Sequence, residues 1–166
     1  EIDELLACHK SVDLLIPRGS NKFVQYIMNN TKIPVMGHAD GICHTYLDKD
    51  ADMEKAVRII VDAKTQYTAA CNSTETLLVD RKIPEEKLAF IAEKLREKNV
   101  VLHGTKEVAN IISCQLMEED EFNTEYLDLE ISIKLVEGVE EAIEHINRFG
   151  SHHTDCIITE NRETAE

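Results

Sequence analysis

The sequence predicts an α/β fold, with helices layered on a β-sheet. Short apolar runs typical of buried strands alternate with segments whose apolar residues recur at helical spacing along all 166 residues. Hydrophobic residues make up 43% of the chain and charged residues 30%, a composition typical of a globular protein with enough length for a core. The sequence contains no internal repeat and no low-complexity segment.

The elements of the first half follow from apolar spacing. Met53, Ala56, Val57, Ile60 and Val61 form one stripe, which predicts an amphipathic helix over about 53–66. The other elements predicted here are a helix over 1–10, a strand over 12–16, a helix through 23–28, a strand over 33–36 and a strand over 42–47.

The second half repeats the alternation. Pro84 fits a first helical turn and Asn99 ends the helix that follows it, while Gly150 is expected to cap a later helix over 139–149. The other elements predicted here are strands over 76–79, 100–103 and 155–158, a helix from 104 through 112, an irregular acidic segment over 117–124 and an extended element over 125–136.

The net charge of −14 bears on the partners of the chain. Nucleic acid and anionic lipid both attract basic surfaces, so neither is expected as a partner. No apolar run approaches the ~18–20 residues that a membrane helix needs, so no membrane-spanning segment is expected. A small anionic substrate would need a locally basic pocket.

The five cysteines are widely spaced and form no CxxC pair. A disulfide scaffold is therefore not expected, and a reducing compartment is the better interpretation. The chain opens in the middle of a pattern, which indicates a fragment of a longer protein.

Cys71 is the candidate nucleophile. It lies between small residues and Asn72, just before an apolar run that predicts a strand. A thiolate in an open turn at an element boundary suits covalent catalysis, and Asn72 with a backbone N–H would serve as oxyanion donors. On the residues alone, a packing role remains the more frequent one for a free cysteine.

Two further patterns are weaker. The turn Pro17-Arg18-Gly19-Ser20 joins a strand to a helix, an arrangement that can direct backbone N–H groups at an anion. An ordinary strand-to-helix turn has the same sequence pattern and is the more frequent case. His38, Cys43 and His44 invite a metal interpretation, but their spacing is wrong for zinc and neighbours on a strand point to opposite faces. No metal is expected, and His38 is expected to line a site instead.

Four segments, in order, resemble one family. DLLIPRGS, IPVMGHADGICHTYLDKDAD, YTAACNSTETLLVDRKI and TEYLDLEISIKLVEGVEEAIEHINRFGSHHTDCIITENRETAE are similar to segments of the gamma-glutamyl phosphate reductases, a branch of the aldehyde dehydrogenase superfamily. The second and fourth are nearest to the reductase half of the bifunctional delta-1-pyrroline-5-carboxylate synthases. The resemblance implies that residues 1–50 are the C-terminal piece of a Rossmann-like NADPH-binding domain. Residues 51–166 would be a layered αβα catalytic domain, truncated at its C-terminus.

The resemblance also implies roles for individual residues. Cys71 would be the nucleophile, the turn Arg18–Ser20, with Gly19 at its centre, would lie beside the nicotinamide, and Glu125 would hydrogen-bond the nicotinamide ribose. His153 and Thr154, in a block similar to Gly-Ser-x-His-Thr-Asp, would line the substrate site with His38.

Oxidising aldehyde dehydrogenases carry a water-activating Glu near Gly37 and His38, and no acidic residue fills that place here. This sequence departs from the family's pattern at Thr68 and Ser73, where the family usually has Pro and Ala.

The implied reaction is the NADPH-dependent reduction of L-glutamyl 5-phosphate to L-glutamate 5-semialdehyde and phosphate, through a thioester, in proline biosynthesis. The parent protein would be a homo-oligomer, and the fragment alone would be inactive. A bifunctional parent would add a glutamate 5-kinase domain and a mitochondrial location, in the matrix or at the inner membrane; a free-standing one would be cytoplasmic. Two alternatives stay open: a cysteine-dependent acyl transferase or hydrolase with a His base, and a non-catalytic oligomerisation fragment.

Overall fold

The computed structural model describes residues 2–37 and 40–166. The chain divides into two compact units, Glu1–Asp40 and Gly41–Glu166. No helix within the described residues is long and apolar enough to cross a membrane.

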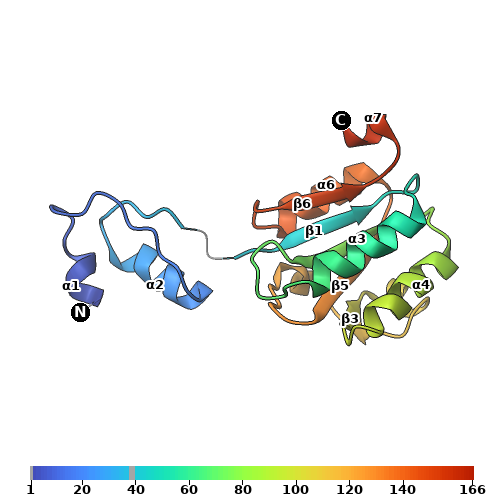
Figure 1. The fold of residues 1–166 in the computed structure, drawn as a ribbon, viewed down its shortest axis with the longest axis horizontal. Helices are drawn as coiled ribbons and strands as arrows, with labels where there is room; N and C mark the ends of the chain where they lie inside the picture. Colours follow the sequence, from blue (N-terminus) through green and yellow to red (C-terminus); the bar gives the residue numbers. More distant parts are fainter. Residues whose placement is uncertain (1, 38–39) are drawn as a thin grey trace. The chain divides into compact units, whose positions relative to one another are not determined.

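The second unit is built on a six-stranded sheet whose strand pairs are all parallel, in the order β4-β3-β5-β2-β1-β6 (Figure 1). The strands are β1 Cys43–Leu47, β2 Thr74–Asp80, β3 Val101–Gly104, β4 Gln115–Leu116, β5 Glu130–Val136 and β6 Asp155–Ile158. Because parallel strands all run one way, their starting ends meet at one edge of the sheet. Cys71, just before β2, therefore shares this edge with the segments that precede β1, β5 and β6.

Helices cover both faces of the sheet (Figure 1). They are α3 Met53–Thr65, α4 Glu85–Arg96, α5 Lys106–Ala109 and α6 Val139–Phe149, with a 3-10 helix η1 Glu119–Asn123. A short helix without buried residues, α7 Arg162–Ala165, follows β6. The larger apolar core lies between one face and α3, α4 and α5, and it includes the fully buried Ile60, Ile91 and Ile133. A smaller core, with Tyr46 and Ala142, lies between the other face and α6.

Local signals explain where the helices begin and end. The Asp52 side chain caps α3 by accepting hydrogen bonds from the N–H groups of Glu54 and Lys55. Asn99 follows α4 with a φ of 62°, a left-handed conformation that Asn tolerates better than most residues. Each cap satisfies backbone groups that the helix itself leaves free.

The predicted α/β class is confirmed, and four segments differ in detail. The extended element expected over 125–136 begins only at Glu130, because Leu127 has a φ of 54° and its N–H turns toward the Glu75 carboxylate. The strands expected over 12–16 and 33–36 reduce to a single parallel bridge between Leu15 and Val35. The acidic segment expected to be irregular contains η1.

The compact units divide between residues 40 and 41, ten residues before the boundary that the sequence predicts. The cause is β1, which pairs with both β2 and β6 and so belongs to the sheet of the second unit. Which unit binds a cofactor stays a prediction.

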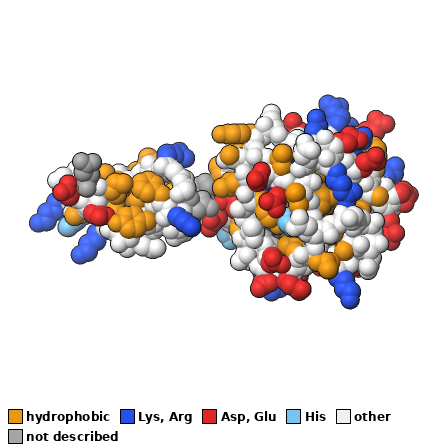
Figure 2. Space-filling view, turned by 90° about the horizontal axis from the view of Figure 1, so that it is seen from below, with side chains coloured by type: hydrophobic (Ala, Val, Ile, Leu, Met, Phe, Trp, Pro, Cys, Tyr) orange, Lys and Arg blue, Asp and Glu red, His pale blue; other side chains and the backbone are white. Residues whose placement is uncertain are grey.

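Within its described residues, the first unit contains two short helices, α1 Ile2–Leu6 and α2 Asn21–Asn30. Leu6, Val24, Ile27 and Ile33 are buried within it. Figure 2 shows that hydrophobic side chains also remain on its surface. The large exposed ones are Ile2, Leu5, Leu14, Ile16, Tyr26, Met28 and Met36.

Candidate active site

Cys71 lies in a tight, accessible turn between α3 and β2. The N–H of Ala70 donates to the Tyr67 carbonyl at 3.1 Å, and the N–H of Ser73 donates to the Ala70 carbonyl at 2.9 Å. Cys71 and Asn72 are exposed, whereas Ser73 is buried and its hydroxyl donates to the Ala63 carbonyl at 3.3 Å. The turn therefore presents the thiol outward from a backbone that is fixed at both ends.

The carbonyl group of Cys71 is held by the segment that leads into β1. A Cβ atom on Gly41 would lie only 2.1 Å from the Cys71 carbonyl oxygen, so the two backbones touch as closely as a glycine allows. The Cys43 thiol donates to the same oxygen at 3.3 Å. Burial raises the pKa of Cys43 to about 11, so this thiol keeps its proton at neutral pH.

Glu125 is tied to the same place. Its Oε1 accepts a hydrogen bond from the Gly41 N–H at 2.8 Å, and the side chain is half-buried. Gly41 thus lies between the carboxylate of Glu125 and the backbone of Cys71. The structure brings Glu125 to the turn that carries Cys71, while its role toward a ribose stays a prediction.

His153 and Thr154 join the site through Cys43. The Nδ1 of His153 lies 3.6 Å from the Cys43 sulfur and 2.8 Å from the Thr154 hydroxyl. His152 has a φ of 57°, and this left-handed residue turns the chain just before β6. Their roles toward a substrate stay predictions, but both belong to the sheet edge that carries Cys71.

Asp155 and His44 anchor this end of β6 to β1. One oxygen of Asp155 accepts from both the backbone N–H and the Nδ1 of His44, each at 3.0 Å. Burial works to raise the pKa of Asp155, but the hydrogen bonds and charge of His44 outweigh it and hold the pKa below its usual range.

The turn that the sequence selected for a nicotinamide lies in the first unit. Arg18, Gly19 and Ser20 are exposed, and Gly19 has a φ of 153°. Ser20 occupies the N-cap position of α2, where its hydroxyl makes no capping hydrogen bond. His38 lies outside the described residues.

Sequence reasoning missed Gly41 and weighed Cys43 only as a metal ligand. Both stand at the start of β1, and a parallel sheet places that start beside the start of β2. Among the described residues, no group of three or more His, Cys, Asp or Glu side chains is arranged to hold a metal ion.

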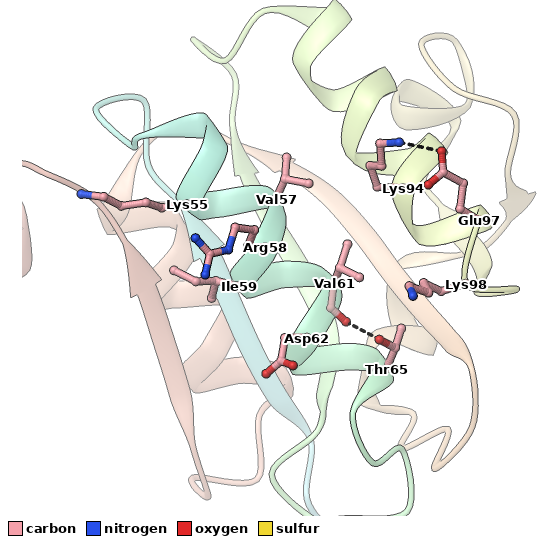
Figure 3. Close-up of a pocket in the computed structure, with 10 residues that line it drawn as sticks. All are labelled: Lys55, Val57, Arg58, Ile59, Val61, Asp62, Thr65, Lys94, Glu97 and Lys98. Atoms are coloured by element: carbon pink, nitrogen blue, oxygen red, sulfur yellow. Dashed lines mark hydrogen bonds and ion pairs between the residues drawn. The ribbon is translucent and has the colours of Figure 1, made fainter.

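A separate hollow of about 730 Å³ lies between α3 and α4 (Figure 3). Four basic side chains and two acidic ones, Asp62 and Glu97, line it, and Lys94 is paired with Glu97. It contains none of the residues that the sequence selected for the site. The cations are Lys55, Arg58, Lys94 and Lys98.

Comparison with known proteins places this geometry in a family. The family model described as "Aldehyde dehydrogenase family" matches residues 1–119. Gamma-glutamyl phosphate reductase 1 of Synechocystis sp. is 57% identical over 100% of this chain and 38% of its own length. Gamma-glutamyl phosphate reductase of Acetivibrio thermocellus is 54% identical over 99% of this chain and 38% of its own length.

A solved structure agrees with this placement. The crystal structure of gamma-glutamyl phosphate reductase from Thermotoga maritima superimposes with a TM-score of 0.95 at 39% identity, over 99% of this chain and 40% of that one. The chain thus spans well under half of the length of these relatives. The parallel sheet, the exposed cysteine before its central strand and the match of the family model lead to one conclusion: this chain belongs to the aldehyde dehydrogenase family.

Proposed function

We propose that this chain carries the nucleophile of an NADPH-dependent reductase that converts L-glutamyl 5-phosphate into L-glutamate 5-semialdehyde and phosphate, a step of proline biosynthesis. One observation carries the proposal: exposed Cys71 has its backbone held by Gly41 and Cys43, with Glu125 bonded to the same glycine. The relatives named gamma-glutamyl phosphate reductase, at 54% and 57% identity, support the choice of substrate.

In the proposed reaction the Cys71 thiolate attacks the acyl carbon of the acyl phosphate. A carbon–sulfur bond forms, the bond from carbon to the phosphate oxygen breaks, and phosphate leaves with the bonding electrons. The Cys71 N–H and the Asn72 side chain make no hydrogen bond to other described residues, so both are available as donors to the oxyanion. Phosphate is a good leaving group, so the step needs no strong general acid.

NADPH, when bound, supplies the hydride that reduces the thioester. The exposed Arg18 guanidinium and the uncapped Ser20 hydroxyl have the chemistry to bind the nicotinamide end, and Gly19 allows close approach. Glu125 is proposed to accept from the ribose. His153 and Thr154 are proposed to line the substrate site, because both lie at the sheet edge of Cys71.

A cysteine-dependent hydrolase or acyl transferase is the second candidate. It needs a His within hydrogen-bond reach of the nucleophile. The Nδ1 of His153 lies against Cys43 and Thr154, and the dependence on nicotinamide and phosphate in the test below separates this candidate from the reductase.

The remaining proposals rest on sequence resemblance alone. They are a homo-oligomeric parent, and either a free-standing cytoplasmic enzyme or a mitochondrial synthase with a glutamate 5-kinase domain in the same chain.

The test uses the full-length protein in the reverse direction. Glutamate 5-semialdehyde and NADP⁺ are mixed with and without phosphate, and NADPH formation is followed by absorbance. The proposal expects formation only with phosphate, since phosphate must cleave the thioester. Formation without phosphate would show an ordinary oxidising aldehyde dehydrogenase, and hydrolysis of an acyl phosphate without nicotinamide would show the hydrolase.

A further inference from the structure

Lys64 and Glu75 form an ion pair that is completely enclosed. The Lys64 ammonium lies 2.9 Å from Oε2 of Glu75, and the two side chains are 0% and 1% exposed. Burial raises the pKa of Glu75, and the nearby ammonium only partly offsets it. Enclosing two charges is costly, and an apolar pair of similar size is often as stable or more so. Stability alone therefore does not account for the pair.

The pair closes the loop that carries the nucleophile. Lys64 lies in the last turn of α3, and Glu75 is the second residue of β2. The ten residues between them contain Cys71 and Asn72, the thiol and the proposed oxyanion donor. The buried ion pair therefore links the two ends of this loop.

Glu75 also reaches the segment that carries Glu125. Its Oε2 accepts from the Tyr126 N–H at 3.3 Å, and its Oε1 accepts from the Leu127 N–H at 3.4 Å. Leu127 is held in a left-handed conformation, with a φ of 54°, which is unfavourable for a residue with a bulky side chain. In this conformation the Leu127 N–H points at the Glu75 carboxylate, which accepts its hydrogen bond.

These contacts connect the two ends of the Cys71 loop to the Glu125 segment and, through Gly41, back to the Cys71 carbonyl. Lys64 bonds to Glu75, and Glu75 bonds to the two residues after Glu125. Glu125 in turn bonds to the Gly41 N–H, and Gly41 touches the Cys71 carbonyl. We propose that Lys64 and Glu75 are positioning residues that fix the Cys71 turn relative to the Glu125 segment; the kinetic part of this inference rests on the proposed function.

The test compares double variants of the full-length protein, because a single change would leave a buried charge unpaired. Lys64→Met with Glu75→Leu removes the ion pair and the acceptor for the backbone. Lys64→Met with Glu75→Gln removes the charges but keeps an acceptor oxygen. The matched control is Lys55→Met with Glu160→Gln, a 2.7 Å pair with exposed side chains in which Lys55 lies on α3, as Lys64 does, and Glu160 follows β6.

Hydrogen exchange is measured by mass spectrometry. The values of kcat and KM for the semialdehyde are measured in the reverse reaction. We expect the Leu variant to exchange about tenfold faster or more in both 66–74 and 125–129, with the control unchanged. Its kcat should fall by about 10–100-fold with KM nearly unchanged, because displacement of the reacting groups by ~1 Å costs about 100-fold. The Gln variant should recover part of both.

Unchanged exchange in either segment would overturn the inference, and so would an unchanged kcat or a change confined to KM. If the Leu variant does not fold, the Gln variant decides by the same criteria. A wild-type protein without phosphate-dependent activity would refute the proposed function, and the exchange data would still decide whether the pair fixes both segments.

Discussion

Gly41→Ala is the substitution that tests the packing around Cys71 most sharply. The added Cβ would lie 2.1 Å from the Cys71 carbonyl oxygen, 2.9 Å from its carbonyl carbon and 2.9 Å from Oε1 of Glu125. Real Cβ atoms essentially never approach other atoms within 3.0 Å. Because the Cys71 carbonyl is backbone, no side-chain rotation relieves the overlap.

The magnitude follows from the size of that overlap. The difference between 3.0 and 2.1 Å means that the two backbones must separate by about 1 Å. Overpacking of this kind costs about 1–3 kcal/mol of the free energy of unfolding. Moving the proposed nucleophile by ~1 Å should lower kcat/KM by about 100-fold, far more than the stability loss alone explains.

The assay measures phosphate-dependent NADP⁺ reduction and urea unfolding on the full-length protein. The control is Gly104→Ala, whose Cβ would lie 2.8 Å from Cγ1 of Val108 and 2.9 Å from Sγ of Cys114. Gly104 ends β3, at the opposite edge of the sheet from Cys71. The control should lose stability but keep its activity per folded molecule. A Gly41→Ala protein with kcat/KM within about threefold of wild type would refute the reasoning.

Two further predictions use pKa shifts. Burial raises the pKa of Cys43 to about 11, so iodoacetamide at pH 8 should leave Cys43 unmodified in the native protein and modify it after unfolding; equal rates by peptide mass spectrometry would contradict this. Burial, with Lys134 and His44 nearby, lowers the pKa of His145 to about 3, so its neutral form stabilises the fold above the unfolded pKa of about 6.5. That contribution to the free energy of unfolding is lost as the pH falls from about 6.5 toward 3. Between pH 7 and pH 4.5, urea unfolding should therefore show a loss of stability about 2–3 kcal/mol smaller in His145→Leu than in wild type. The same pH dependence in both proteins would contradict the prediction.

Much of the second unit could be predicted from local pattern. The apolar stripe of 53–66 gave α3 within a residue of its observed end, and the helix over 139–149 matches α6. These elements were accessible because amphipathic spacing directly reflects which face is buried. The path of the Glu125 segment could not be predicted in this way, because it depends on the Glu75 carboxylate, 50 residues earlier in the chain.

The candidate site shows the same division. Cys71 stood out from its turn and its neighbours, but only the resemblance to a family favoured a catalytic role over packing. Lys64 could not, since a lysine in the last turn of a helix usually serves the helix dipole at the surface, and only the fold reveals its burial. Gly41 and Cys43 were within reach of topology, because parallel strands bring their starting residues together.

The most direct measurement is made on full-length Cys71→Ala beside wild type. Phosphate-dependent NADP⁺ reduction is assayed, and NADPH binding is measured by fluorescence. The account predicts a loss of at least about 10⁴-fold in kcat with binding retained, because no other group would form the thioester. A variant that keeps most of its activity would show that Cys71 only packs the turn, and would contradict the central claim.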